Sequence, residues 1–395
     1  MAEQISRDSG VRQRSWLGRW WRRARGGRMV AVGVDLRLME PGGANGGVKP
    51  LVFSFLGEIA RAHGKRFRFV FFANPELVGE LADIARGEDE IVTSGGAAGA
   101  FDVLYAPFGR SELMRPEVPT VSLVVDLLHR DLPSALPVEE VNYRHAWFTQ
   151  IARDAAYFQC ISHYTAGRLQ HHYGVDPRRC FVTHVAVQAR LGGTTDDAAA
   201  KAELARAGAL SPAPAAECYF FFPANSWPHK NHEALFEAFR RYRADAKESA
   251  WSLVLTGHPD ERMRALEARA GAMGLGAAVR FSGHLDHERF VATWRGAGVL
   301  VYPSLHEGFG IPLLEAMAFG VPILAANTTS LPEVGGDVCV YVDPRNVAAM
   351  AAAMAELAGN AALRADLGRR GARRLKMFSL TREAEKLAEH LARAG

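Results

Sequence analysis

Residues 302–320, YPSLHEGFGIPLLEAMAFG, constrain the fold more than any other stretch of the chain. An apolar run just before them predicts a buried strand, and Gly308 and Gly310 mark the loop that follows. Pro312 is typical of the first turn of a helix, because a proline there loses no hydrogen bond that the helix needs. Gly320 is typical of a helix end. The stretch therefore predicts a strand, a glycine-rich loop and a short helix, in that order.

A strand, loop and helix of this kind suit the binding of an anion such as a diphosphate. The N-terminus of the helix carries free N–H groups and the positive end of the helix dipole. Gly308 and Gly310 let the backbone approach a ligand closely, since neither has a side chain. Glu307 and Glu315 add one carboxylate before the loop and one within the helix. Together these features predict a binding site.

Strand-like and helical patterns alternate along most of the chain, and this alternation predicts the fold class. The strand-like apolar runs lie at residues 29–34, 67–73, 103–106, 121–125, 157–161, 180–187, 219–222, 251–257, 279–282, 299–302, 321–326 and 338–342. Helical patterns between them, such as residues 75–86, favour parallel, doubly wound α/β sheets, which bind ligands at the carboxyl ends of their strands. The length of 395 residues predicts two or three domains. Residues 191–217, rich in Gly, Pro and Ala, are typical of a linker between domains.

The composition excludes several classes of protein. Apolar residues make up 48% and charged residues 23%, as in an ordinary soluble globular protein. No stretch reaches 18 consecutive apolar residues, so the sequence predicts no transmembrane helix. The four cysteines are scattered in apolar runs without a C-x-x-C pattern, which predicts buried free thiols and a reducing cytoplasm. A net charge of +4 is too small to indicate a nucleic-acid partner.

Residues 12–28 differ in character from the rest of the chain. They contain seven arginines and no acidic residue, with Trp16, Trp20 and Trp21 interleaved. On a helix these aromatic side chains would gather on one side, which suits a membrane surface that carries anionic lipids. This interpretation places the protein at the inner face of the cytoplasmic membrane. The glycines in the segment equally allow a disordered basic tail, so both interpretations stay open.

Two further junctions between a strand and a helix predict anion-binding groups. The glycine-rich loop at residues 41–48 contains Gly46 and Gly47 and precedes a helix with apolar residues at 3–4 spacing. It matches neither the G-x-G-x-x-G dinucleotide fingerprint nor a P-loop. The second junction is at residues 223–232, where Lys230 is well placed to bind a phosphate as a point charge.

The order of Ser304, Glu307, a Gly-Phe-Gly run and Glu315 resembles the E-x7-E signature of retaining nucleotide-sugar glycosyltransferases of family 4. The resemblance covers about residues 29–395. It implies the GT-B architecture, in which two doubly wound Rossmann-like domains face each other across a cleft. It divides the chain into an N-terminal extension (residues 1–28), an acceptor-side domain (29–190) and a linker (191–217). A nucleotide-sugar-binding domain (218–377) follows, and a C-terminal helix (378–395) crosses back to the first domain.

The resemblance also implies roles for individual residues. Glu307 would face the transferred sugar, Lys230 would bind the diphosphate, and Glu315 would bind the ribose hydroxyls. The implied catalytic residues are Glu307, Lys230 and His129, and the implied acceptor side contains Asp126 and His129. The residues implied in donor binding are Gly46, Gly47, Asn225, His229, Lys230, Gly283, His284, Leu285, Ser304, Gly308, Phe309, Gly310, Ile311, Leu314 and Glu315.

Two positions depart from the pattern of the family. Val125 stands where many members have a histidine, and Asn225 stands where many have an arginine that helps the lysine to embrace the diphosphate. His229 is the nearest substitute for this second cation, if it is protonated. No D-x-D metal motif appears between strand signals, so the resemblance implies a reaction without a metal or other cofactor. Lys230, the loop amides and the helix N-terminus would then stabilise the charge that grows on the departing diphosphate.

The sequence leaves three functions open. The first is a retaining glycosyltransferase that moves a sugar, with mannose from GDP-mannose as the favoured case, to a lipid-linked or polysaccharide acceptor in cell-surface glycan synthesis. The second is a non-catalytic nucleotide-sugar-binding partner in a glycan assembly complex, which the two departures support. The third is a phosphorylase or sucrose-type enzyme that acts on soluble sugars, which the basic N-terminal segment disfavours.

Overall fold

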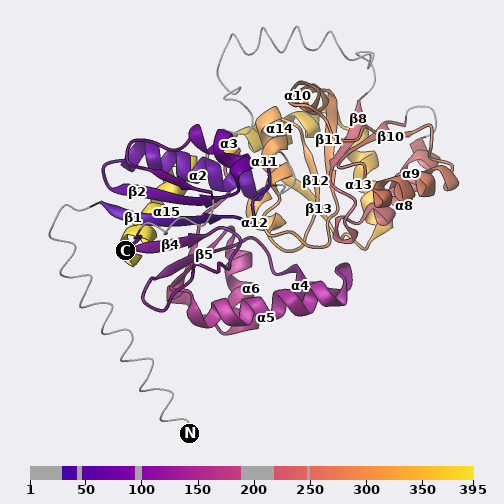
Figure 1. Cartoon of the computed structure of the whole chain (residues 1–395). Helices are drawn as coiled ribbons and strands as arrows, with labels where there is room; N and C mark the ends of the chain where they lie inside the picture. Colours follow the sequence, from indigo (N-terminus) through magenta and orange to yellow (C-terminus); the bar gives the residue numbers. More distant parts are fainter. Residues whose placement is uncertain (1–28, 42–46, 94–99, 188–217, 247–249) are drawn as a thin grey trace.

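The structure of the chain is a computed structural model. It describes residues 29–41, 47–93, 100–187, 218–246 and 250–395. The predicted N-terminal extension, the predicted linker and Gly46 lie outside the described residues. The described residues form two lobes, each built on one parallel sheet with helices around it (Figure 1). This arrangement confirms the predicted pair of doubly wound α/β sheets.

The sheet of the first lobe has seven parallel strands in the order β3-β2-β1-β4-β5-β6-β7. They are β1 (Val30–Leu36), β2 (Phe67–Ala73), β3 (Glu90–Val92), β4 (Val103–Ala106), β5 (Thr120–Val124), β6 (Tyr157–Cys160) and β7 (Cys180–Val182). The central strands are buried along almost their whole length, since helices cover both faces of such a sheet. The winding reverses between β1 and β4, and ligands bind in the crevice that such a reversal leaves at the carboxyl ends of the strands.

Five α-helices belong to the described part of the first lobe. They are α2 (Val48–His63), α3 (Val78–Ala82), α4 (Leu128–Asp131), α5 (Val138–Asp154) and α6 (His163–Tyr173), with 3-10 turns at Pro75–Leu77, Pro133–Ala135 and Pro177–Arg179. The buried face of α2 carries Phe55 and Ile59 at i and i+4 spacing. Ser162 caps α6, because its hydroxyl accepts a hydrogen bond from the backbone N–H of Thr165 at 3.0 Å.

The sheet of the second lobe has six parallel strands in the order β10-β9-β8-β11-β12-β13, and its winding reverses between β8 and β11. The strands are β8 (Tyr219–Pro223), β9 (Ser252–Thr256), β10 (Val279–Phe281), β11 (Ala297–Tyr302), β12 (Ile323–Ala326) and β13 (Cys339–Val342). The helices are α8 (His232–Ala246), α9 (Glu261–Ala272), α10 (His287–Gly296), α11 (Ile311–Phe319), α12 (Leu331–Gly335), α13 (Val347–Gly359) and α14 (Ala361–Leu375), with a 3-10 turn at Pro228–Lys230.

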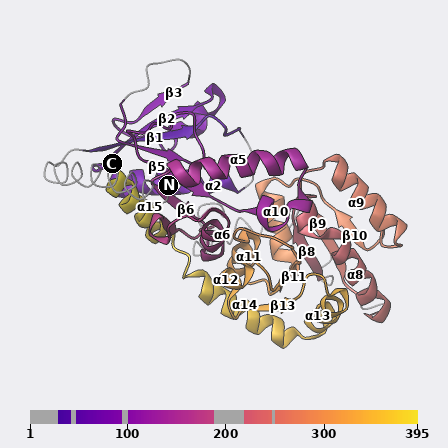
Figure 2. The ribbon, with the colours of Figure 1, turned by 90° about the horizontal axis from the view of Figure 1, so that it is seen from below.

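The last helix, α15 (Leu380–Ala394), returns to the first lobe. Figure 1 shows it in yellow behind α2 and β1, and Figure 2 shows it at the same lobe from below. The Thr381 hydroxyl donates to Glu58 of α2 at 2.6 Å, and Lys386 donates to the carbonyl of Val182 at 3.3 Å. The chain therefore connects the two lobes a second time through its C-terminus.

A few local predictions differ from the structure. The helix expected at residues 75–86 is a 3-10 turn followed by the short α3, which ends at Ala82. The strand after Gly320 begins at Ile323, two residues later than expected. Cys218 is exposed because it lies just before β8, whereas a buried thiol was expected. Among the described residues, no helix combines the length and the hydropathy needed to cross a membrane.

Candidate active site

A buried lysine–glutamate pair lies where the winding of the second sheet reverses. Lys230 follows β8 and Glu307 follows β11, so both side chains come from the carboxyl ends of neighbouring strands. The Lys230 ammonium donates to the Glu307 carboxylate at 2.6 Å and to the Tyr302 hydroxyl at 3.0 Å. Each of the two charged side chains is only 11% exposed.

Both members of this pair are charged at neutral pH. Burial alone would lower the pKa of Lys230, but the Glu307 carboxylate and the Tyr302 hydroxyl raise that pKa above its ordinary value. Burial alone would raise the pKa of Glu307, but Lys230 lowers it below its ordinary value. The site therefore holds a cation and an anion in contact, away from bulk water.

The glycine loop after Glu307 is formed as the sequence predicts. Gly310 has a φ of 99°, in the left-handed region, and caps the N-terminus of α11. A Cβ atom at Gly308 would lie 1.7 Å from the carbonyl oxygen of Val125 in the first lobe, so only glycine fits there. Phe309 is buried between the two glycines. The first lobe therefore packs directly on the loop that is predicted to bind a diphosphate.

Hydroxyl groups from the segment after β12 fix the backbone of Glu307. The Glu307 N–H donates to the Thr329 hydroxyl at 3.2 Å, and the Ser330 hydroxyl donates to the Glu307 carbonyl at 2.9 Å. Thr329 and Ser330 precede α12, so from the sequence alone two hydroxyl residues at this place could be helix caps or could line a cleft. Ser304, which precedes Glu307 in the motif, is fully buried.

The helix after the loop places the other predicted donor-binding residues of this region. Leu314 is fully buried and Glu315 is 2% exposed, both on α11. Ile311 begins this helix and reaches the first lobe, since a Cβ atom at Gly47 would lie 2.7 Å from its Cδ1. Gly47 belongs to the N-terminal glycine-rich loop, so the structure brings both predicted glycine loops together between the lobes.

Two hydroxyls at the start of α6 also hold the glycine loop. The Ser162 hydroxyl donates to the Gly308 carbonyl at 2.7 Å, and the Thr165 hydroxyl donates to the same oxygen at 3.2 Å. Asp126 lies in the first lobe near the site, where its Oδ1 accepts the Leu128 N–H at 2.9 Å and lies 3.7 Å from the Arg144 guanidinium. The predicted acceptor-side carboxylate is thus placed next to a cation.

His129 lies in the interior of the first lobe. It is 1% exposed, its ring stacks on Phe148 with 5.0 Å between centroids, and its Nε2 is 2.7 Å from the Tyr173 hydroxyl. Burial lowers the pKa of His129 to about 4, so it is neutral at pH 7. These contacts, with Phe148 of α5 and Tyr173 of α6, are all within the first lobe.

The possible replacements for the second phosphate-binding cation do not carry a charge. Burial, together with the nearby Lys230, lowers the pKa of His229 to about 4, so His229 is neutral at pH 7. Asn225, at the arginine position of the family, accepts the backbone N–H of His258 at 2.9 Å. In the described structure, Lys230 alone of these three residues offers a positive charge to a diphosphate.

The turn that the resemblance assigns to the nucleobase closes β10. Gly283 has a φ of 64°, and its carbonyl accepts the Gly257 N–H at 3.0 Å. His284 is exposed and Leu285 is partly buried. The backbone of this turn is therefore fixed by β9, and its side chains remain accessible.

An aspartate of the first lobe, which the sequence analysis does not single out, reaches the motif of the second lobe. Asp131 Oδ2 lies 3.0 Å from His306 Nε2 and accepts the Tyr164 hydroxyl at 2.9 Å. Its Oδ1 lies 2.7 Å from Arg168 Nε and 2.7 Å from His172 Nε2. Burial alone would raise the pKa of Asp131, but the hydrogen bonds from these partners bring it well below its ordinary value. The only signal in the sequence is an acidic residue a few positions after an apolar, strand-like run.

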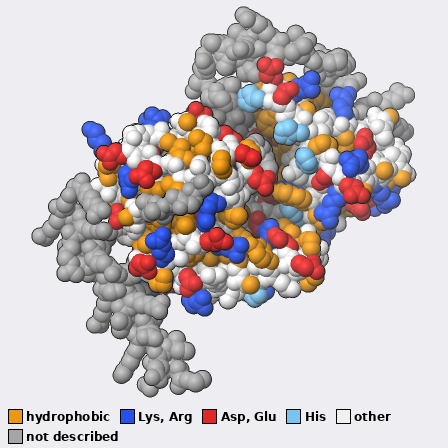
Figure 3. All heavy atoms as spheres, viewed as in Figure 1, with side chains coloured by type: hydrophobic (Ala, Val, Ile, Leu, Met, Phe, Trp, Pro, Cys, Tyr) orange, Lys and Arg blue, Asp and Glu red, His pale blue; other side chains and the backbone are white. Residues whose placement is uncertain are grey.

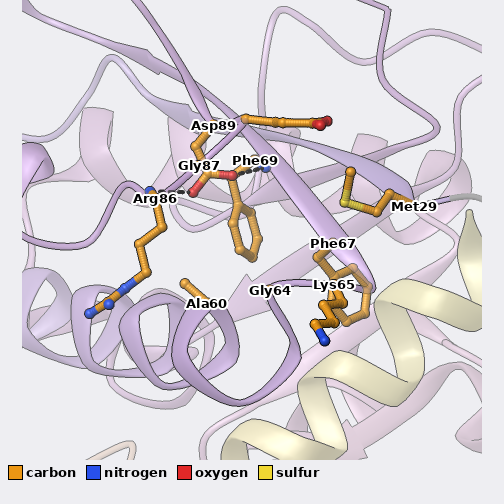
Figure 4. Close-up of a pocket in the computed structure, with 10 residues that line it drawn as sticks. Met29, Ala60, Gly64, Lys65, Phe67, Phe69, Arg86, Gly87 and Asp89 are labelled. Atoms are coloured by element: carbon orange, nitrogen blue, oxygen red, sulfur yellow. Dashed lines mark hydrogen bonds between the residues drawn. The ribbon is translucent and has the colours of Figure 1, made fainter.

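A pocket of about 500 Å³ lies away from these residues, at the amino ends of the first strands (Figure 4). Met29, just before β1, and Phe67, the first residue of β2, line the wall of this pocket. Asp89 also lines it and accepts the Phe69 N–H at 2.7 Å and the Arg86 N–H at 2.9 Å. None of the predicted site residues lines this pocket. The candidate active site is instead the region where the lobes meet, and Figure 3 shows histidine side chains on this face close to that boundary.

Two doubly wound parallel sheets, each in its own lobe, define the GT-B class of fold. Residues 211–374, which include Lys230, Glu307 and Glu315, match the family described as glycosyl transferases group 1. This stretch, less than half of the chain, is similar to that family.

Known relatives cover part of the chain. O-antigen chain mannosyltransferase B of Escherichia coli is 30% identical over 164 residues, which are 41% of this chain and 42% of that protein. O-antigen chain mannosyltransferase RfbU of Salmonella typhimurium is 30% identical over 128 residues, 32% of this chain and 35% of that protein. The matched part of this chain thus spans less than half the length of either relative.

Solved structures are similar over nearly the whole chain. A glycosyltransferase from Rickettsia africae has a TM-score of 0.67 at 13% identity, covering 92% of this chain and 98% of that one. WaaG, a glycosyltransferase involved in lipopolysaccharide biosynthesis, has a TM-score of 0.65 at 13% identity, covering 91% and 99%. Anabaena HepE, solved in complex with UDP and glucose, has a TM-score of 0.66 at 16% identity, covering 92% and 99%. At these identities the likeness shows the fold.

Proposed function

We propose that the protein is a retaining glycosyltransferase that moves a hexose from a nucleoside-diphosphate sugar to a hydroxyl group of a glycan acceptor. The observation that carries the proposal is the buried Lys230–Glu307 pair beside the glycine loop at the N-terminus of α11. The pair combines a phosphate-binding cation with a carboxylate that can contact the sugar. In this proposal residues 218–377 form the donor domain and residues 29–190 form the acceptor-side domain.

The chemistry of the reaction fits these groups. The bond between the anomeric carbon and a phosphate oxygen breaks, so negative charge grows on the diphosphate. Lys230, the backbone amides of the glycine loop and the positive end of α11 stabilise that charge without a metal ion. The acceptor oxygen bonds to the anomeric carbon on the face that the phosphate leaves, and the leaving phosphate takes the acceptor proton. The configuration at the anomeric carbon is thereby retained.

Glu307 acts in this scheme as an electrostatic and positioning group for the sugar. Its carboxylate stays ionised beside Lys230, and the hydroxyls of Thr329 and Ser330 fix its backbone. An anion near the anomeric carbon stabilises the positive charge that develops there as the phosphate departs. Glu315 binds the donor ribose, since a carboxylate can accept hydrogen bonds from two hydroxyl groups.

We propose mannose, transferred from GDP-mannose, as the sugar, and a lipid-linked or polysaccharide chain at the cell surface as the acceptor. The support is the mannosyltransferase names of relatives at 30% identity. A lipid-linked acceptor also accounts for the seven arginines and the tryptophans at residues 12–28, which would hold the protein at the inner face of the cytoplasmic membrane.

The test is Glu307→Gln, which keeps the shape of the side chain and removes its charge. We expect release of GDP from GDP-mannose, with mannose oligosaccharides as acceptors, to fall by about a hundredfold or more. GDP affinity should stay within about tenfold, or 1.4 kcal/mol. Glu356→Gln, an exposed glutamate of α13, is the matched control and should change neither quantity.

The second candidate is a non-catalytic nucleotide-sugar-binding partner in a glycan assembly complex. It is favoured by the lack of a second cation at the two expected positions, since in the described structure Asn225 and the neutral His229 stand there. Wild-type protein that binds a nucleoside diphosphate and transfers no sugar to any acceptor would support this candidate. Transfer at the wild-type rate by Glu307→Gln would overturn the role given to the Lys230–Glu307 pair.

A further inference from the structure

Two histidines of the first lobe meet a glutamate of the second lobe behind the glycine loop. His163 is the first residue of α6, His184 follows β7, and Glu333 lies on α12. Their ligand atoms all lie within 4.8 Å of one another. His184 Nε2 is 2.8 Å from Glu333 Oε1, and the two imidazole rings are 5.8 Å apart between centroids. Figure 2 shows α6 beside α12 where the lobes meet.

We propose that His163, His184 and Glu333 form a binding site for a divalent transition-metal ion that joins the two lobes. Two imidazole nitrogens and one carboxylate oxygen are a donor set that Zn²⁺ and Co²⁺ accept in tetrahedral sites, with water as the fourth ligand. His163 is exposed, so water and the ion both have access to the site. Nothing in the proposed sugar transfer uses these three side chains, which makes this a separate site.

The distance between His184 and Glu333 requires only a small adjustment. A tetrahedral ion with bonds of about 2.1 Å to nitrogen and oxygen holds these two atoms roughly 3.4 Å apart. His184 Nε2 and Glu333 Oε1 are 2.8 Å apart, so they need to separate by roughly 0.6 Å. The ion would then occupy the place of the shared proton. The His163 side chain, being exposed, can turn towards the ion without displacing buried groups.

The surroundings already orient two of the three ligands. The ring of His184 packs against Phe309 and Phe378, with centroid distances of 5.8 and 5.6 Å. The carboxylate of Glu333 accepts the backbone N–H groups of His163 at 2.8 Å and of Tyr164 at 3.0 Å. Hydrogen bonds of this kind commonly fix carboxylate ligands in metal sites. Fixing the side chains of His184 and Glu333 therefore costs little conformational free energy when an ion binds.

The charge at the site is also suitable. Burial alone would raise the pKa of Glu333, but His184 and the two backbone N–H groups bring it below its ordinary value, so this carboxylate is an anion at neutral pH. The positive end of α6 opposes a cation, and the anionic carboxylate that sits on it offsets this effect.

An ion at this position would restrain the movement of one lobe against the other. His163 and His184 belong to the first lobe and Glu333 belongs to the second, so their separation would break bonds to the metal. This consequence rests on the proposed function and on the further assumption that the nucleotide leaves when the lobes part. A saturating metal ion should therefore slow turnover several-fold and leave the first turnover nearly unchanged.

The experiment is a titration of the metal-free, full-length protein with Co²⁺, followed by calorimetry and by the visible absorption of tetrahedral cobalt. The wild type should bind one Co²⁺ with this absorption. His163→Ala should weaken that binding by about tenfold or more, because loss of a ligand costs at least as much as loss of a group that only supports one. His171→Ala, an exposed histidine on the same helix, is the matched control and should bind like the wild type.

Equal Co²⁺ binding by the wild type and His163→Ala would overturn the proposal, as would no tetrahedral absorption in the wild type. Either result would leave the three residues as a hydrogen-bonded contact between the lobes. Glu333→Gln gives a second reading, since the amide can still accept one backbone N–H but is a poor metal ligand. The binding readout does not depend on sugar transfer, so a protein that binds Co²⁺ here and transfers no sugar would contradict only the proposed function.

Discussion

Replacement of Gly308 by alanine tests how the two lobes meet over the glycine loop. A Cβ atom at this position would lie 1.7 Å from the carbonyl oxygen of Val125, whereas real contacts of Cβ atoms do not fall below 3.0 Å. The loop and the first lobe must therefore part by about 1.3 Å, the difference between these two distances. A displacement of about 1 Å in a reacting group costs on the order of a hundredfold in rate. We expect kcat/KM for sugar transfer to fall by about a hundredfold.

The same variant should leave the folding of each lobe nearly unchanged. The three atoms nearest to the added methyl group all belong to Val125 and Asp126 of the first lobe, so the core of the second lobe is not involved. Thermal unfolding should therefore resemble that of the wild type, while small-angle X-ray scattering should report a larger radius of gyration. Gly271→Ala is the matched control, because no atom lies within 4 Å of its new Cβ. A Gly308→Ala variant with wild-type kcat/KM and wild-type scattering would refute the described contact.

Three further predictions concern pH, the donor and the membrane. Burial lowers the pKa of His129, His229 and His232 to about 4. Between pH 6.5 and 4 the unfolded chain therefore binds protons that the folded chain does not. The free energy of unfolding should fall as the pH drops through this range, by at most about 3 kcal/mol for each histidine. Urea denaturation across this range measures the change, and a constant free energy would contradict it. Glu315→Gln should raise the donor KM by about ten- to a hundredfold with a smaller change in kcat, since a hydrogen bond to a charged group contributes about 1.5–3 kcal/mol. An unchanged KM would exclude the contact between Glu315 and the ribose. Deletion of residues 1–28 should weaken binding to anionic liposomes in a flotation assay, and equal binding by the truncated protein would exclude the membrane interpretation.

The sequence predicts most of the fold because a parallel sheet buries its strands on both faces. The central strands therefore appear as uninterrupted apolar runs, as in β1 and β11. Helix α5 has no such signal, since only Phe148 and Ile151 of its 17 residues are buried and its exposed faces are polar. Elements with one narrow apolar stripe are the ones that sequence patterns miss.

The glycine loop and its neighbours are predictable because each depends on a short local pattern. Glu307, Gly310 and Lys230 lie at junctions between strands and helices, where the backbone fixes the direction of the ligand-facing groups. The side chain of His129 also follows a strand, but whether it turns towards the cleft or the interior depends on packing with Phe148. The position of His129 after a strand therefore does not predict the direction in which its side chain points.

The contacts between the lobes could not be predicted from the sequence. Ser162 meets Gly308 across 146 positions in the chain, and Asp131 meets His306 across 175 positions. Such pairs depend on how two separately folded sheets are oriented, which neither periodicity nor a local motif determines. For the same reason, the meeting of His184 with Glu333 is apparent only in the structure.

The central claim is that Lys230 forms the diphosphate site of a sugar-nucleotide donor. The most direct test is a calorimetric titration of GDP, UDP and ADP into the wild type and into the Lys230→Met variant. The double variant Lys230→Met, Glu307→Gln is the control, because Lys230→Met alone leaves the Glu307 carboxylate unpaired. We predict that the wild type binds at least one of these nucleotides, with GDP favoured, and that both variants bind it about tenfold to a hundredfold more weakly. A wild type that binds none of them, or a Lys230→Met variant that binds as tightly as the wild type, would contradict the account.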